Sequence, residues 1–314
     1  MQPFTLTLSN GATVAGIQSI PPQSPTSPKH RPLIIALHGG TYDCHYFDAT
    51  RTYTASIHST AFGIPFISID RPCYGGTTSF LPVPPDSTFS QETGLWLHRH
   101  IIPAVWREFG PRNSCNSVVL LCHSFGSIGG IVAAALHAQE DATTNPAYYP
   151  LSGLIVSGMG DKQAESMKNA PAMQPNVGTG HVLFPLAIKD SFMLGWPGNV
   201  ATEVLGQTDR LNTVSPLVEM HDLGWWLLCW KEWAAQVKTA VMFALVEDDV
   251  FFDATEEEVR ICKEAFRRSK RVDASLVRGA PHCMELSYWA QGWYARCFGF
   301  AMECAATLGV TSAD

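Results

Sequence analysis

The chain has 314 residues, a length typical of one α/β core that carries an insertion. Hydrophobic residues make up 46% and charged residues only 16%, against roughly 25% charged in soluble domains, so much apolar surface must be buried or must bind apolar ligands. The net charge of -7 gives no basic surface, which argues against a nucleic-acid partner and against an anionic membrane surface.

The N-terminal stretch lacks a basic segment followed by an apolar one, so we expect no secretory signal. Nine cysteines without a C-x-x-C pair indicate free thiols in a reducing compartment, and we therefore expect a cytoplasmic protein. The eleven histidines show no H-E-x-x-H spacing. The sequence thus predicts neither a metal site nor a cofactor.

Secondary structure follows a regular order. Alternating residues flank Asn10-Gly11, a pair typical of a tight hairpin, and predict two antiparallel strands at the N-terminus. Short apolar runs then predict buried parallel strands at 33–37, 64–69, 118–122, 151–157, 240–246 and 271–277. Helices are predicted at 46–60, 88–108, 125–138, 254–268 and 285–308. This alternation predicts an α/β fold, a mostly parallel sheet with helices on both faces.

The stretch 118–136, VVLLCHSFGSIGGIVAAAL, contains no charged residue and has two possible interpretations. Its length would allow a membrane-spanning helix, which needs about 20 apolar residues. Alternatively, 118–122 is a strand, His123-Ser124-Phe125 is a turn, and a helix follows. A membrane helix would remove the third parallel strand from the series, so we expect the second arrangement and no membrane insertion.

Residues 158–233 interrupt the alternation with many Pro and Gly residues and with five of the nine tryptophans. So much aromatic surface must be buried, and we expect a helical cap over the C-terminal ends of the strands. The core would then comprise 1–157 and 234–314. A cap that only completes the core without touching a ligand is the alternative. Four residues are candidates for the substrate pocket: Thr41, Trp196, Trp225 and Trp226.

Ser124 lies where a predicted strand meets a predicted helix. The surrounding Cys122-His123-Ser124-Phe125-Gly126 approximates the G-x-S-x-G of a nucleophile elbow, with Cys122 in place of the first glycine. Taken alone, a near-match is weak evidence for a nucleophile, because small residues are also common at strand–helix junctions for packing reasons. A serine nucleophile further needs a general base, an orienting carboxylate and two N–H donors for the oxyanion.

Residues of these kinds follow other predicted strands. His282 comes after the last strand, and EDDVFFD after strand 240–246 offers Glu247, Asp248, Asp249 and Asp253. The order serine, acid, histidine at three strand ends is the one expected for this architecture. LHGG after the first parallel strand allows the N–H groups of Gly40 and Phe125 to form an oxyanion hole. A buried, structural role is the alternative for His282 and the expectation for His38, His123, Asp70 and Arg71.

The segments LIIALHGG, IPFISIDRPCYGGTTS, LLCHSFGSIGG, ALVEDDVFFDATEEE and VRGAPHCMELS resemble the α/β-hydrolase superfamily over nearly the whole chain. The family's G-x-x-D pattern falls on residues 246–249, so the resemblance implies Asp249 as the triad acid. Asp248 is the rival, because the usual glycine is missing. The chain is also similar to filamentous-fungal α/β hydrolases, many of which act in secondary metabolism.

The expected function is a serine hydrolase with a Ser124-His282-Asp249 triad. It would cleave an ester, lactone or thioester of a bulky apolar small molecule through an acyl-serine, without a cofactor. Two alternatives remain open. One is a non-hydrolytic catalyst of the same fold that makes or breaks a carbon-carbon bond or acts as a lyase or cyclase. The other is a ligand-binding receptor with little turnover.

Overall fold

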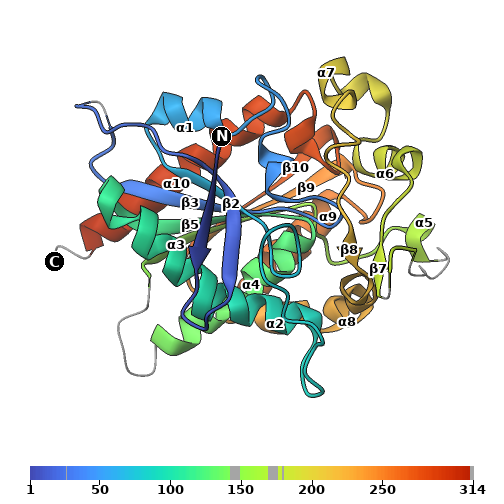
Figure 1. The fold of residues 1–314 in the computed structure, drawn as a ribbon, viewed down its shortest axis with the longest axis horizontal. Helices are drawn as coiled ribbons and strands as arrows, with labels where there is room; N and C mark the ends of the chain where they lie inside the picture. The colour runs from blue at the N-terminus through green and yellow to red at the C-terminus, as the bar shows by residue number, and fades with distance from the viewer. Residues whose placement is uncertain (26, 142–148, 169–175, 179, 312–314) are drawn as a thin grey trace.

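A central eight-stranded sheet organises the molecule, which is known from a computed structural model describing residues 1–25, 27–141, 149–168, 176–178 and 180–311 (Figure 1). In this sheet the antiparallel pairs are β1 (Gln2–Thr7) with β2 (Thr13–Ser19) and β2 with β4 (Phe66–Ile69), and its other pairs are parallel. This confirms the predicted mostly parallel sheet. In sheet order the strands are β1 (Gln2–Thr7), β2 (Thr13–Ser19), β4 (Phe66–Ile69), β3 (Arg31–Leu37), β5 (Cys115–His123), β6 (Leu151–Ser157), β9 (Ala240–Asp248) and β10 (Val272–Pro281).

The predicted N-terminal hairpin is present. Thr7 pairs with Thr13, and the connecting turn has Gly11 in a left-handed conformation with φ of 80°. The Asn10 side chain accepts a hydrogen bond from the N–H of Ala12 at 3.1 Å. An Asn-Gly pair forms such a turn readily, because Asn bonds its own backbone and Gly tolerates positive φ.

The parallel strands are buried on both faces, as their continuous apolar runs predict. In β3, Leu33, Ile35 and Leu37 join one hydrophobic core, while Ile34 and Ala36 join the core on the opposite face. Successive side chains of a strand point to opposite faces, so one short run supplies both cores. The sheet is therefore the middle layer between two hydrophobic cores.

Helices cover both faces of the sheet (Figure 1). One face carries α1 (Ser56–Phe62) and α10 (Ala290–Thr311). The other carries α3 (Ile102–Phe109), α4 (Phe125–Asp141), α8 (Leu217–Ala234) and α9 (Glu256–Ala265). Helix α2 (Phe89–Trp96) packs against α4 and continues through a π-helical turn, η2 (Leu97–Ile101), into α3; a short 3-10 turn, η3 (Pro111–Asn113), precedes β5.

Three predicted helices are shorter than expected, and for the one predicted at 254–268 only the ends differ, since α9 spans Glu256–Ala265. The helix expected at 46–60 is a 3-10 turn, η1 (Cys44–Phe47), an irregular segment and then α1. In that segment the Thr50 hydroxyl accepts hydrogen bonds from the N–H groups of Thr52 and Tyr53, and such local bonds compete with a helix. The helix expected at 285–308 starts only at Ala290, after the 3-10 turn η5 (Met284–Leu286).

The segment 158–233 contains short elements that gather at one end of the sheet, together with the long helix α8 (Figure 1). Trp226 and Trp230 of α8 belong to the same hydrophobic core as the sheet. Residues 169–175 and 179 of the expected cap lie outside the described residues. None of the helices described is both long and apolar enough to cross a membrane. The short elements are α5 (Glu165–Lys168), β7 (His181–Val182), α6 (Leu186–Met193), η4 (Pro197–Asn199), α7 (Thr202–Leu205) and β8 (Ser215–Pro216).

Candidate active site

Ser124 occupies the turn between β5 and α4 in a left-handed conformation, with φ of 51°. Such a backbone costs a non-glycine residue about 1–3 kcal/mol and persists only where the surroundings impose it. Here the Ser124 N–H donates to the Ser157 carbonyl at 2.8 Å. A Cβ on Gly126 would lie 2.4 Å from the Leu37 carbonyl oxygen, so glycine is needed where α4 crosses β3. The turn thus places Ser124 at the carboxyl end of β5.

His282, in the loop after β10, lies between Ser124 and an acidic residue. Its Nε2 is 3.0 Å from Ser124 Oγ, and its Nδ1 is 2.8 Å from Asp249 Oδ2. The side chains of His282 and Asp249 are each only 1% exposed. Since Nδ1 faces a carboxylate, it carries the proton, which leaves Nε2 free to accept the serine proton.

The structure distinguishes between the two candidate acids. Asp248 ends β9 and is exposed, whereas Asp249 turns inward toward His282. The second carboxylate oxygen of Asp249 accepts the N–H of Phe251 at 2.8 Å. The carboxylate is thus oriented from two sides.

The loop after β3 brings Gly39 and Gly40 against the serine. A Cβ on Gly39 would lie 2.9 Å from Ser124 Cβ, and a Cβ on Gly40 would lie 2.6 Å from the Phe125 ring. Phe125 is the first residue of α4, so its N–H has no acceptor within the helix. The N–H groups of Gly40 and Phe125 are therefore the candidate oxyanion donors near Ser124.

His38 braces this loop and is fully buried. Its Nδ1 lies 2.7 Å from the Gly39 carbonyl, and its Nε2 accepts the Arg71 N–H at 3.1 Å. Burial, together with the positive charge of Arg71, lowers the pKa of His38 to about 3. The imidazole is therefore neutral, with its proton on Nδ1.

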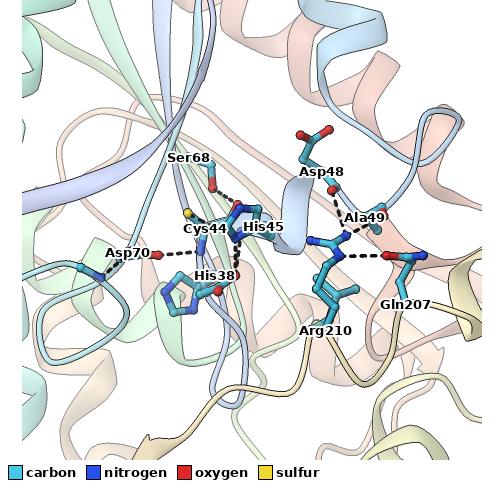
Figure 2. A network of polar contacts seen from close by, with 12 residues as sticks. His38, Cys44, His45, Asp48, Ala49, Ser68, Asp70, Gln207 and Arg210 are labelled. Carbon is cyan, nitrogen blue, oxygen red and sulfur yellow. Dashed lines mark hydrogen bonds and ion pairs between the residues drawn. The ribbon is translucent and has the colours of Figure 1, made fainter. Parts of the chain in front are cut away.

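The loop that follows the glycines is held from two sides, as Figure 2 shows. Asp70 accepts the Cys44 N–H at 2.9 Å, and the Ser68 hydroxyl donates to the Cys44 carbonyl at 2.7 Å. From the opposite side, Arg210 of the segment 158–233 donates to the Ala49 carbonyl at 2.7 Å. Asp70 is thus a loop brace, as the sequence suggested.

His123 is buried between the rings of Tyr46 and His282. Its ring stacks on Tyr46 with 4.9 Å between centroids, and the His282 ring lies 5.0 Å away. Its Nδ1 is 3.1 Å from the Ser157 hydroxyl. Burial and the neighbouring His282 hold the pKa of His123 well below its usual range. A neutral His123 packs beside His282 without competing for its proton.

Glu285 is a buried carboxylate behind the same histidines that sequence reasoning did not single out. It accepts hydrogen bonds from Tyr46 Oη at 2.8 Å, Trp293 Nε1 at 2.9 Å and Ser157 Oγ at 3.2 Å. Burial raises its pKa, while these donors act in the opposite direction. The group joins η1, β6 and α10 beneath the site.

A second buried carboxylate, Glu219 of α8, was also missed. Arg71 and Tyr74, both in the loop after β4, donate hydrogen bonds to it. Burial acts to lower the pKa of Arg71, but the charge of the adjacent Glu219 outweighs this effect, and the pKa of Arg71 is raised. This ion pair fixes α8 to the core beside the site. No sequence pattern links Glu219 to a residue 148 positions away.

A mainly apolar cavity of about 230 Å³ opens above Ser124. Thr41 lines it, as expected, but the three candidate tryptophans do not. Trp196 is 72% exposed, Trp225 is half-buried outside the cavity, and Trp226 is buried in the core. Large apolar side chains suit a core as well as a pocket, so tryptophan content alone could not distinguish the two. The lining consists of Gly40, Thr41, Ser124, Phe125, Met159, Gln163, Met167, Phe184, Lys189, Phe192, Met193, Met220, His221, Leu223, Phe251 and Phe252.

Comparison with known proteins adds a family assignment. Residues 34–293 match the model of the alpha/beta hydrolase family. The structure is similar to the esterase RhEst1 from Rhodococcus sp. ECU1013, with a TM-score of 0.62, 15% identity, and coverage of 96% of this chain and 98% of that chain. It is also similar to proline iminopeptidase from Mycobacterium smegmatis, with a TM-score of 0.59, 14% identity, and coverage of 98% and 99%.

A third similar structure is an N-acyl homoserine lactonase, AidH, a mutant of which was crystallised with N-hexanoyl homoserine. The TM-score is 0.59 at 13% identity, with 96% of this chain and 97% of that chain covered. At such identities the likeness shows a shared fold only. A search of the curated proteins finds no match.

Proposed function

Because the chain belongs to the alpha/beta hydrolase family, we propose that it is a serine hydrolase in which Ser124, His282 and Asp249 form the catalytic triad. The observation that carries the proposal is the continuous chain of contacts from Ser124 Oγ to His282 Nε2, at 3.0 Å, and from His282 Nδ1 to Asp249, at 2.8 Å. The left-handed Ser124, beside a cavity, adds support.

The proposed reaction begins when Ser124 Oγ attacks a carbonyl carbon while His282 Nε2 accepts its proton. Asp249 stabilises the resulting imidazolium, and the N–H groups of Gly40 and Phe125 receive the oxyanion. His282 then protonates the leaving oxygen or sulfur, which departs and leaves an acyl-serine. Water, deprotonated by His282, attacks this ester and releases the acid together with free Ser124.

The cavity wall supports an uncharged, apolar acyl group as the substrate class. Methionine and phenylalanine side chains make up most of the lining, and Met is well suited to irregular ligands. Lys189, a cation in the wall, already donates to two backbone carbonyls. An ester, lactone or thioester of a bulky apolar small molecule, including a secondary metabolite, fits these properties, and no cofactor is required.

The segment 158–233 is proposed to act as the cap over this cavity. Seven of the lining residues lie in its α6 and α8 or in the stretch just before α6: Phe184, Lys189, Phe192, Met193, Met220, His221 and Leu223.

All nine cysteines lie in the described residues and are free thiols, which supports a cytoplasmic location.

A substrate panel tests the proposal. It comprises p-nitrophenyl esters of increasing chain length, aryl esters, lactones and N-acetylcysteamine thioesters, assayed with the wild type and with Ser124→Ala. We expect hydrolysis that favours apolar acyl groups and a loss in Ser124→Ala of about 10³-fold or more. Binding of apolar ligands without hydrolysis of any panel member would contradict the proposal and favour a non-hydrolytic catalyst or a receptor.

A further inference from the structure

Thr41 follows the candidate oxyanion residue Gly40 and is held by the segment 158–233. It is a buried non-glycine residue in a left-handed conformation, with φ of 66°. Its N–H donates to Ser215 Oγ at 2.9 Å. Its carbonyl accepts from Lys189 Nζ at 3.0 Å and from the Thr213 N–H at 2.8 Å. Both backbone polar groups of this strained residue are therefore fixed by residues more than a hundred positions away.

Lys189 is the most unusual of these partners, since a lysine is rarely buried. It lies on α6 with 1% of its surface exposed. Its Nζ donates to the carbonyls of Thr41 and Leu211 and lies 3.8 Å from the centre of the Tyr42 ring. These three neighbours match the three hydrogens of an ammonium group. The amine is thus engaged with the protein and is not available to pair with a substrate anion.

The glycines beside Ser124 have no side chain to fix their own conformation. Their position must be imposed by neighbours: His38 holds the Gly39 carbonyl, and Lys189 and Ser215 hold the peptide groups that flank Thr41. The Gly40–Thr41 peptide is planar, so the bond from the Thr41 N–H to Ser215 also fixes the Gly40 carbonyl. The Gly40 N–H belongs to the preceding peptide, whose Gly39 carbonyl His38 holds, and the two anchors together set the backbone direction at Gly40.

We propose that Lys189 is a positioning residue for the oxyanion hole, so that helix α6 both walls the cavity and aligns the Gly40 N–H with Ser124. The inference rests on the proposed hydrolase function. It assigns to the segment 158–233 a role in transition-state stabilisation, in addition to substrate enclosure. An oxyanion donor acts on the developing charge, so misplacing it lowers kcat more than it weakens substrate binding.

Lys189→Met tests this inference. Loss of a complete oxyanion donor costs about 10²–10³-fold in kcat, and a misaligned donor should cost about 10- to 100-fold. We expect such a fall in kcat with KM changed less than about 3-fold. Ser191→Ala, on the same helix, is the control, because its exposed hydroxyl donates to the Ile188 carbonyl of α6, its one hydrogen-bond partner among the described residues. The control should retain wild-type kinetics.

Inhibitor binding separates positioning from simple loss of structure. An arylboronic acid, which forms a tetrahedral adduct with serine, should lose affinity in Lys189→Met in proportion to kcat/KM. A methyl ketone of similar size, bound without a covalent bond, should keep its affinity. Equal loss of both affinities, or wild-type kcat in Lys189→Met, would overturn the inference.

Ser215→Ala provides a second route if Lys189→Met does not fold. It removes the acceptor for the Thr41 N–H and should lower kcat in the same selective way, and an unchanged kcat would count against the inference.

The rate of Ser124 labelling by a fluorophosphonate serves as a readout that needs no known substrate. An unlabelled wild type would overturn the proposed function itself, whereas a labelled wild type with equally fast variants would overturn only the role of Lys189.

Discussion

Asp249 and His282 share a hydrogen bond of 2.8 Å, although they follow different strands and lie 33 positions apart. The neighbouring Asp248 is exposed at the end of β9, and the imidazole bonds Asp249 instead. The usual glycine of the acid loop is absent, so this contact depends on the turn after Val246, where the Asp249 N–H donates to the Val246 carbonyl at 3.3 Å.

The two aspartates should therefore differ in their effect on catalysis. Asp249→Asn should lower kcat by about 10²–10⁴-fold, because the amide can hold His282 in the wrong tautomer. Asp248→Asn, the matched control one residue away, should stay within about 2-fold of wild type. Steady-state kinetics on one hydrolysed ester would decide. A large loss in Asp248→Asn with an active Asp249→Asn would reverse the assignment.

The buried ion pair between Arg71 and Glu219 should be important for stability. Glu219→Gln would leave the guanidinium of Arg71 buried without its countercharge and should lower the free energy of unfolding by about 3–5 kcal/mol. An exposed pair on α9 provides the comparison: Glu264→Gln removes a partner of Arg260, and the change should be below about 1 kcal/mol. Urea unfolding measures both, and equal effects would refute the expected role of burial.

Lys189 should make stability depend on pH. Burial lowers its pKa to about 8 in the folded protein, from 10.5 in an unfolded chain. Between these values the unfolded chain holds a proton that the folded protein has released, so stability rises with pH. The penalty of burying the charge is complete below pH 8 and absent above 10.5.

Lys189→Met isolates this effect, because it lacks the titrating group. The free energy of unfolding of wild type minus that of the variant should rise by about 1.4 kcal/mol per pH unit above pH 8. Urea unfolding of both proteins at pH 7.5 and 9.5 measures the difference. A value that stays constant across this interval would show that the lysine keeps its ordinary pKa.

The cavity lining should set acyl-group preference. Phe192 lines the cavity and packs against Phe251 with 6.0 Å between ring centroids. Phe192→Ala should enlarge the cavity and shift kcat/KM toward longer acyl chains. Trp196→Ala is the control, because Trp196 is 72% exposed and outside the lining. The ratio of rates on long and short esters should change at least about 5-fold in the first variant only, since each buried CH₂ contributes about 0.8 kcal/mol.

The sheet could be predicted because its strands are apolar on both faces and its hairpin has a specific turn signal. The prediction of one helix over 46–60 was wrong, because the Thr50 hydroxyl accepts hydrogen bonds from neighbouring backbone N–H groups there. The short elements between 158 and 216 have too little internal pattern to identify. Contacts such as the hydrogen bond from the Cys283 N–H to the Met193 carbonyl hold them in place.

The order of Ser124, the acids and His282 along the chain was enough to predict that they meet at one edge of the sheet. The family's G-x-x-D pattern favoured Asp249 over Asp248, but without its usual glycine the pattern left the backbone register after Val246 open. The pocket was harder still: tryptophans expected to line it lie in the core or at the surface. Lys189 carries no local signal, because its partner Thr41 is 148 positions away in the sequence.

If Ser124 is an activated nucleophile, it should react covalently with a probe that requires no knowledge of the substrate. Purified wild type, Ser124→Ala and His282→Ala would be treated with a fluorophosphonate probe, and the modified peptide identified by mass spectrometry. We expect labelling at Ser124 in wild type, none in Ser124→Ala and much slower labelling in His282→Ala. An unlabelled wild type whose cavity still binds small apolar ligands, or labelling that persists in Ser124→Ala, would contradict the proposed role of Ser124.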